Sequence, residues 1–208
     1  MATPESERAW THYKKILEQE ASTRNQKDLD QPTQGKLLLD VRKASEFEDL
    51  GFLLSDGSPD STLLADAELL ETPLFLYLEF APAVELPQFA SYLDSEAALA
   101  AGNGNWDLAT DDILAMLNIA KQLNDVPLVY FLDQSYQVGR QAMERVLICL
   151  MHQSSGFSND QLLRLEERIK NYRLEKFQSD FAGEHWIFAD MLQRAFVITE
   201  SGDGYIHL

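Results

Sequence analysis

The side chains in this sequence that could support chemistry are one cysteine and a few histidines. Cys149 and His152 are three residues apart, and His185 shares a helical stripe with Phe181 and Phe188. A cysteine nucleophile needs a base within hydrogen-bond reach, so Cys149 with His152 or His185 is one hypothesis. The alternative is a packed histidine and a small buried thiol, which is the usual state of a free cysteine on an apolar face. We favour the alternative and predict no catalytic residue.

The sequence also lacks the residue spacings that are typical of metal sites and of acid–base catalysis. The four histidines form no His-x-x-x-His or Glu-x-x-His motif, so zinc and di-iron bundle sites lack their ligands. They are His12, His152, His185 and His207. An EF-hand needs glycine at its sixth position, and neither Asp56–Asp66 nor Asn103–Asp112 has it there. Glu184 with Asp180 or Asp190 forms carboxylate pairs of the kind that chance supplies in an acidic chain. We therefore predict no cofactor and no metal.

The most distinctive charge feature is an acidic stretch. Residues 44–120 contain fifteen Asp and Glu side chains, from Glu46 to Asp112, and the first Lys or Arg after them is Lys121. One hypothesis is a recognition surface for a basic partner. The other is a solvated acidic face, which is the usual explanation of such a run.

The whole composition excludes several classes of protein. The chain has 208 residues, with 17 Lys plus Arg against 34 Asp plus Glu, a formal net charge of -17. Nucleic acids and anionic membranes repel such a chain, so we expect neither as a partner. No stretch approaches the roughly 20 apolar residues of a spanning helix, and residues 1–20 show no signal peptide. We expect a soluble chain, associated with the cell envelope only if an N-terminal anchor has been removed.

Helical periodicity dominates the elements that must position these side chains. In the first half we predict a helix after Thr3-Pro4, a mobile loop over 22–35, and short helices over 36–50 and 61–71. In the second half the predicted helices are 86–101, one starting near Asn105, one starting near Pro127, 159–169 capped by Ser158, and about 172–196. The tail, 197–208, contains Ser201-Gly202-Asp203-Gly204 and predicts a small β-hairpin.

Two of these helices carry long apolar stripes at spacings of three and four. The first stripe consists of Trp106, Ala109, Ile113, Met116, Leu117, Ala120 and Leu123. The second consists of Leu128, Leu132, Tyr136, Gly139, Met143, Leu147 and Leu150. We expect both stripes to face the core. The predicted fold is a single all-α domain over residues 1–208, made of seven or eight helices in antiparallel hairpins, either a bundle or a solenoid.

The segment Ala97–Ala109 resembles the turn region of a tetratricopeptide repeat. Small Ala97 and Ala100 precede Gly104-Asn105-Trp106, and Ala109 follows. The small residues let two helices approach closely, and the aromatic ring fills the groove between them.

A wider resemblance covers about residues 86–192. The order of Leu86-Pro87, Ala97–Gly104, Leu114–Leu123 and Gly183-Glu184 is similar to a group of all-helical bacterial proteins that are abundant in planctomycetes. These proteins often carry an N-terminal membrane anchor and have no assigned catalytic residues. The resemblance implies a helical-hairpin fold and an envelope location.

Together these observations predict a non-enzymatic scaffold or protein-interaction module. A groove on the side of Glu46–Asp112 would favour a partner that is basic or carries a basic helix. The alternative is an enzyme or small-ligand-binding domain whose site is assembled from residues distant in sequence, with His185, Cys149 and Glu184 as the first candidates. Self-association is a third option.

Overall fold

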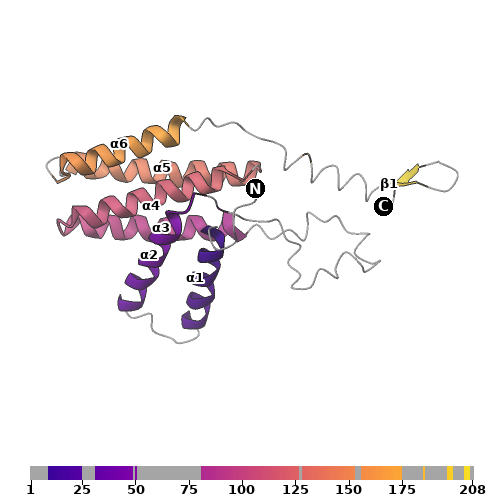
Figure 1. The fold of residues 1–208 in the computed structure, drawn as a ribbon, viewed down its shortest axis with the longest axis horizontal. Coiled ribbons are helices and arrows are strands. Elements are labelled where there is room, and N and C mark those ends of the chain that lie inside the picture. Colours follow the sequence, from indigo (N-terminus) through magenta and orange to yellow (C-terminus); the bar gives the residue numbers. More distant parts are fainter. Residues whose placement is uncertain are drawn as a thin grey trace. The chain divides into compact units, whose positions relative to one another are not determined.

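The computed structural model describes residues 9–24, 31–48, 50, 81–126, 128–152, 156–174, 185, 196–198 and 204–206. Its helices are α1 (Ala9–Arg24), α2 (Gln31–Ser45), α3 (Ala81–Gly102), α4 (Trp106–Asn124), α5 (Val129–His152) and α6 (Asn159–Leu174) (Figure 1). The chain divides into two units. These six helices lie in the first unit, apart from Ala81 and Val129, the first residues of α3 and α5. The prediction of an all-α fold is confirmed for this unit. No described helix is both long and apolar enough to cross a membrane.

Helix α4 is the centre of the helical unit. Gly104, with a φ of 76°, makes the tight turn that follows α3, and Asn105 then caps α4 by accepting a hydrogen bond from the Leu108 amide at 3.3 Å. The predicted stripe faces the core: except for the half-buried Trp106, all its members are buried. Because α4 also buries polar side chains, such as Thr110 and Gln122, its neighbours must supply hydrogen-bond partners.

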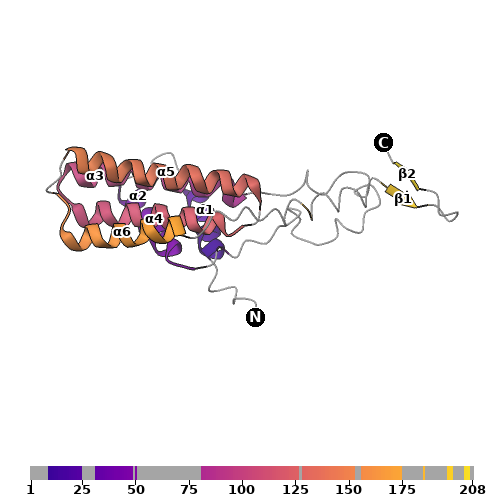
Figure 2. The ribbon, with the colours of Figure 1, turned by 90° about the horizontal axis from the view of Figure 1, so that it is seen from above.

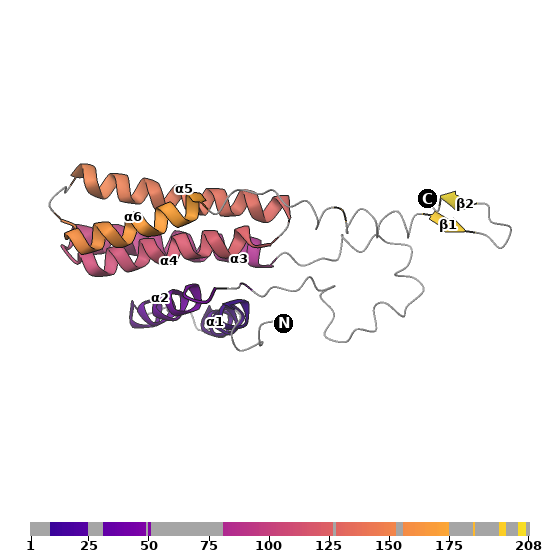
Figure 3. The same ribbon diagram turned by 45° about the horizontal axis from the view of Figure 1, so that its top comes forward.

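The other helices of the unit surround α4. Figures 2 and 3 show α3, α5 and α6 running beside α4, while α1 and α2 lie across one side of these four helices. Buried hydrogen bonds connect the layers: Ser135 Oγ on α5 donates to the Ala120 carbonyl at 2.6 Å, and Tyr172 on α6 donates to the Ser135 carbonyl at 3.1 Å. The N–H of Trp10 donates to the Leu50 carbonyl at 2.8 Å and ties the start of α1 to the chain after α2.

Some helix limits differ from those that the sequence predicts. Helix α1 continues to Arg24 and α2 begins at Gln31, so both enter the expected loop 22–35, of which 25–30 lies outside the described residues. Helix α3 begins at Ala81 and contains Pro87, whose missing N–H leaves one carbonyl of the preceding turn without its helical bond. The helix predicted over 61–71 lies outside the described residues.

The limits of α6 combine a confirmed cap with a correction. Ser158 Oγ accepts from the Gln161 amide at 3.3 Å, and Gln161 Oε1 accepts from the Ser158 amide at 2.8 Å, which forms a capping box. The helix then continues unbroken to Leu174, so the predicted break between 169 and 172 is wrong. No glycine or proline stands there, and Tyr172 is anchored in the core. Of the rest of the predicted helix 172–196, only His185 and Phe196 are described, and Phe196 begins the short strand Phe196–Ile198.

Helix α5 buries a face that overlaps the predicted one only in part. Of the predicted stripe, Leu128 and Gly139 are buried, Leu132, Met143 and Leu150 are half-buried, and Tyr136 and Leu147 are 55% and 58% exposed. The buried positions are Phe131, Ser135, Val138, Gly139, Ala142, Val146 and Cys149. Apart from Phe131, this face has small or medium-sized side chains, and α5 lies close to α6 at one point: a Cβ on Gly139 would stand 2.4 Å from the Tyr172 hydroxyl oxygen. Close approach between helices therefore contributes to the choice of face.

The second unit contains two short strands, β1 (Phe196–Ile198) and β2 (Gly204–Ile206), paired antiparallel with Val197 opposite Tyr205. Most residues of this unit lie outside those that the structure describes. The predicted β-hairpin over 197–208, the mobility of 22–35 and the single-domain organisation therefore stay predictions.

Candidate functional site

Three ionisable side chains from three helices meet in a buried cluster, which we call the Arg42 cluster. Arg42 on α2 donates from Nε to Asp112 Oδ1 on α4 at 2.6 Å. Its Nη2 lies 3.0 Å from Glu96 Oε2 on α3. The side chain of Asp112 is fully buried, and those of Arg42 and Glu96 are 15% and 25% exposed. The cluster is the one place among the described residues where an ion network is buried against α2.

The electrostatics of the Arg42 cluster are unbalanced because two carboxyls share one guanidinium. Asp112 Oδ2 is buried without a hydrogen-bond partner among the described residues, while Arg42 Nη2 and Glu96 Oε2 face each other at 3.0 Å without the geometry of a hydrogen bond. Burial raises the pKa of Asp112 to about 7, although Arg42 opposes this, and the charges of Glu96 and Asp111 add to the rise. The cluster thus resembles in chemistry the buried, perturbed carboxyls found at functional sites.

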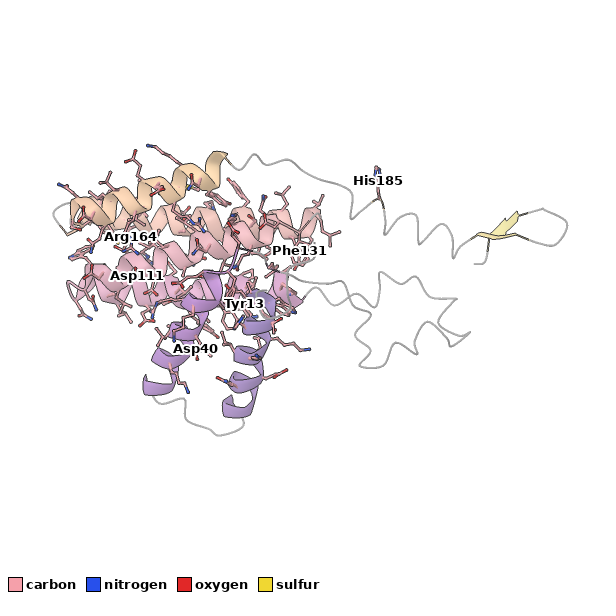
Figure 4. All side chains as sticks on the ribbon, viewed as in Figure 1. Tyr13, Asp40, Asp111, Phe131, Arg164 and His185 are labelled. Carbon is pink, nitrogen blue, oxygen red and sulfur yellow. The ribbon has the colours of Figure 1, made fainter. Side chains whose placement is uncertain are left out.

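Many described acids of the acidic stretch are engaged within the protein. Asp94 on α3 accepts two hydrogen bonds from Arg145 on α5, at 2.6 and 2.8 Å. Gln161 on α6 donates to Asp107 on α4 at 2.6 Å. One turn along the same two helices, Arg164 pairs with Asp111 at 2.9 Å (Figure 4). These carboxylates join α3 and α4 to the later helices. Glu46 and Glu48, which follow α2, are exposed.

An apolar surface lies near the C-terminal end of α5. Leu147, Ile148 and Met151 are 58%, 44% and 81% exposed, and we call them the α5 patch. Leu99 on α3 is 68% exposed and lies five residues after Asp94. On α5 the α5 patch likewise follows Arg145, the partner of Asp94. The C-terminal ends of α3 and α5 lie at the same end of the unit (Figure 2). Contiguous exposed apolar side chains of this kind are typical of binding surfaces.

The described residues test the cysteine and histidine candidates only one by one. Cys149 is buried on α5, which confirms its interpretation as a small buried thiol. Burial raises the pKa of this thiol, with Arg145 opposing and Asp94 adding to the rise. His185 is exposed, and the residues on either side of it lie outside those described, so its packing stays a prediction. The side chain of His152 and all of Glu184, Asp180 and Asp190 lie outside the described residues.

The segments weighed for calcium have other roles where they are described. In Asn103–Asp112, Asn105 caps α4, and Asp107, Asp111 and Asp112 hold side chains of α6 and α2. Asp56–Asp66 lies outside the described residues. Trp106 packs edge-on against Phe157, with ring centroids 4.9 Å apart, and so contributes to packing at the start of α6.

Sequence reasoning missed both the Arg42 cluster and the α5 patch. The cluster joins positions 42, 96 and 112, and no spacing rule connects residues so far apart. The patch was visible as an apolar run over 146–151, whose members cannot all fit on one helical face. No protein-family model, curated protein or solved structure matches the chain.

Proposed function

We propose that this protein is a non-catalytic protein-interaction or scaffold module that binds its partner through the α5 patch. The observation that carries the proposal is the exposure of Leu147, Ile148 and Met151 on a helix that already buries another face. A helix with two apolar faces can pack in its own fold and against a second chain. The ionic side chains around it, such as Asp94 and Arg145, are engaged in holding helices together.

The partner that fits this surface is a basic amphipathic helix of another protein. An exposed helical ridge pairs with apolar side chains at spacings of three and four on a second helix. The net charge of -17 attracts a cationic partner. At physiological ionic strength salt screens this attraction beyond about 8 Å. The attraction therefore comes from the total charge and from exposed acids such as Glu46, because several acids of α3 and α4 are paired internally.

The test is binding of a synthetic amphipathic helix of leucine and lysine, about 18 residues long, measured by fluorescence anisotropy. The double variant Leu147→Ser, Met151→Ser is expected to bind about tenfold more weakly, because it loses apolar contact area. Leu163→Ser on α6 is the matched control, since Leu163 is 60% exposed but outside the α5 patch. Equal binding by the double variant and the control would refute the α5 patch as the binding surface.

A peptide of the same composition with its leucines scrambled separates helix recognition from charge attraction. It is expected to bind weakly and without sensitivity to the double variant, since only the ordered peptide presents an apolar face. Binding of the ordered peptide is also expected to weaken as salt is raised. If both peptides bind alike at every salt concentration, the interaction is charge attraction alone and the proposal is wrong.

One observation favours the second candidate, a small-ligand-binding domain or enzyme with a site assembled from residues distant in sequence. Asp112 has a free buried oxygen and a pKa raised to about 7, and its neighbours come from α2 and α3. Because its side chain is fully buried, a ligand would reach it only by displacing α2. Protection of Asp112 from titration by an added metabolite would support this function.

Several finer predictions belong with the proposal. The tetratricopeptide-like arrangement of hairpins, the C-terminal β-element over 197–208, the likeness to the planctomycete group and an envelope location all fit a helical interaction module. Self-association is the third class, for which light scattering across a range of concentrations is the test. A mass that stays at 23.6 kDa throughout would remove it.

A further inference from the structure

Charge balance in the Arg42 cluster depends on a proton. One guanidinium faces two carboxyls, of which Asp112 is fully buried. With one carboxyl protonated the cluster is neutral, and with both ionised it carries one uncompensated negative charge. An uncompensated buried charge is strongly unfavourable, because the protein interior solvates it poorly. Asp112 Oδ2 is buried and has no described partner, so it is the position where the proton can reside.

The cluster is one polar attachment of the α1–α2 pair to α4 among the described residues. Another is Gln122 on α4, whose amide nitrogen lies 2.7 Å from the Phe47 carbonyl after α2 and whose amide oxygen accepts from Tyr13 on α1 at 3.0 Å. Gln122 does not titrate, whereas Asp112 does. The two positions are ten residues apart on α4, about 15 Å along the helix. A change of pH therefore acts on one attachment and leaves the other intact.

We propose that the Arg42 cluster is a proton-dependent latch, which holds α2 against α3 and α4 while one carboxyl is protonated and loosens when both are ionised. The charged groups facing Asp112 are Arg42 from α2, Glu96 from α3 and Asp111 from α4. Asp111 is itself paired with Arg164 of α6, which moderates its effect. This inference goes beyond the proposed function and does not depend on it.

The direction of the effect follows from the two states of Asp112. When α2 is latched, the pKa of Asp112 is about 7, and when the carboxyl is exposed to water it returns toward the ordinary value of 3.8. The latched state therefore binds the proton more tightly. Its extra stability is complete at or below about pH 4, falls as the pH rises, and is lost above about pH 7.

The experiment is hydrogen–deuterium exchange of the full chain at about pH 5 and about pH 7, corrected for the intrinsic pH dependence of amide exchange. Exchange of the α2 amides is expected to rise about tenfold or more, since each pKa unit between the two states is a factor of ten. Exchange of the amides in the middle of α6 is expected to change little. Unchanged α2 exchange between the two pH values would overturn the proposal.

Two variants and one direct measurement make the test specific. Asp112→Asn imitates the protonated side chain and is expected to abolish the pH dependence of α2 exchange. Glu144→Gln is the control, because it removes an acid from the exposed Arg140–Glu144 pair of α5 and is expected to behave as wild type. If Asp112→Asn fails to fold, carboxyl-carbon NMR of the wild type decides: a titration midpoint for Asp112 above about 5 supports the latch, and one below it overturns the latch.

Discussion

Arg145 shows at the scale of single residues how this protein uses its charges. Its Nε and Nη2 atoms bind the two carboxylate oxygens of Asp94, and this pairing raises the pKa of the guanidinium further. Both side chains are less than a fifth exposed. Two-pronged pairs of this kind are stronger and more directional than single hydrogen bonds. Arg145 therefore fixes the position of α5 beside α3, and Cys149 lies one turn further along α5.

The reactivity of Cys149 tests its interpretation as a structural residue. Because Cys149 is only 6% exposed and burial raises the pKa of its thiol, little thiolate is available to react. We expect the native protein to react with an aromatic disulfide reagent at neutral pH at least about tenfold more slowly than the urea-unfolded chain. Absorbance of the released thiolate measures both rates. Equal rates would mean that Cys149 is accessible and would reopen the cysteine–histidine hypothesis.

At the scale of elements, α5 shows why one helix can have two apolar faces. Its buried face accommodates close contact with α6, where the Tyr172 ring lies against Gly139. Leu147 and Met151 lie on another face and stay exposed. One face of α5 therefore packs in the fold while the α5 patch stays exposed.

Substitution of two helical glycines tests the close contact. Gly139→Ala is expected to destabilise the protein by about 1–3 kcal/mol, because the added Cβ would lie 2.4 Å from the hydroxyl oxygen of the buried Tyr172. Gly35→Ala on α2 is the matched control, since nothing lies within 4 Å of its added Cβ. It is expected to stabilise by about 0.5–1 kcal/mol through helix propensity. Urea unfolding measures both, and a Gly139→Ala variant as stable as Gly35→Ala would contradict the contact.

At the scale of the whole helical unit, Gln122 connects segments far apart in the chain. Its amide joins α4 to the carbonyls of Ala44, Ser45 and Phe47 and to the hydroxyl of Tyr13. The side chain is fully enclosed, and burial raises the pKa of Tyr13 well above its ordinary value. Such an enclosed network is favourable only when every member is satisfied.

Gln122→Ala is therefore expected to lower the free energy of unfolding by about 2–3 kcal/mol, because it leaves a buried hydroxyl and several carbonyls without a partner. Gln137→Ala is the control: Gln137 is exposed on α5 and bonds only to Asp133 among the contacts described for it, so a change within about 0.5 kcal/mol is expected. Denaturant unfolding followed by circular dichroism gives both values. A loss for Gln122→Ala no larger than that of the control would show that the network is not cooperative.

Most of the helical architecture in the described residues could be predicted from the sequence, because local forces decide it. Helical periodicity placed the stripe of α4, and capping chemistry placed its start at Asn105 and the start of α6 after Ser158. The net charge of -17 follows from composition alone, and the absence of a nucleic-acid partner that it favours stays a prediction. Each of these features depends on residues within a few positions of one another or on composition alone.

Tertiary structure alone decided which face of α5 is buried and which acids meet which bases. The apolar residues of α5 satisfy a helical period on more than one face, and contacts with the neighbouring helices select between them. Arg42, Glu96 and Asp112 are distant in sequence, and their meeting depends on how α2, α3 and α4 pack. Burial and the charges of Glu96 and Asp111 then raise the pKa of Asp112. Sequence determines the elements through local interactions, whereas the candidate sites arise from contacts between elements that no local pattern encodes.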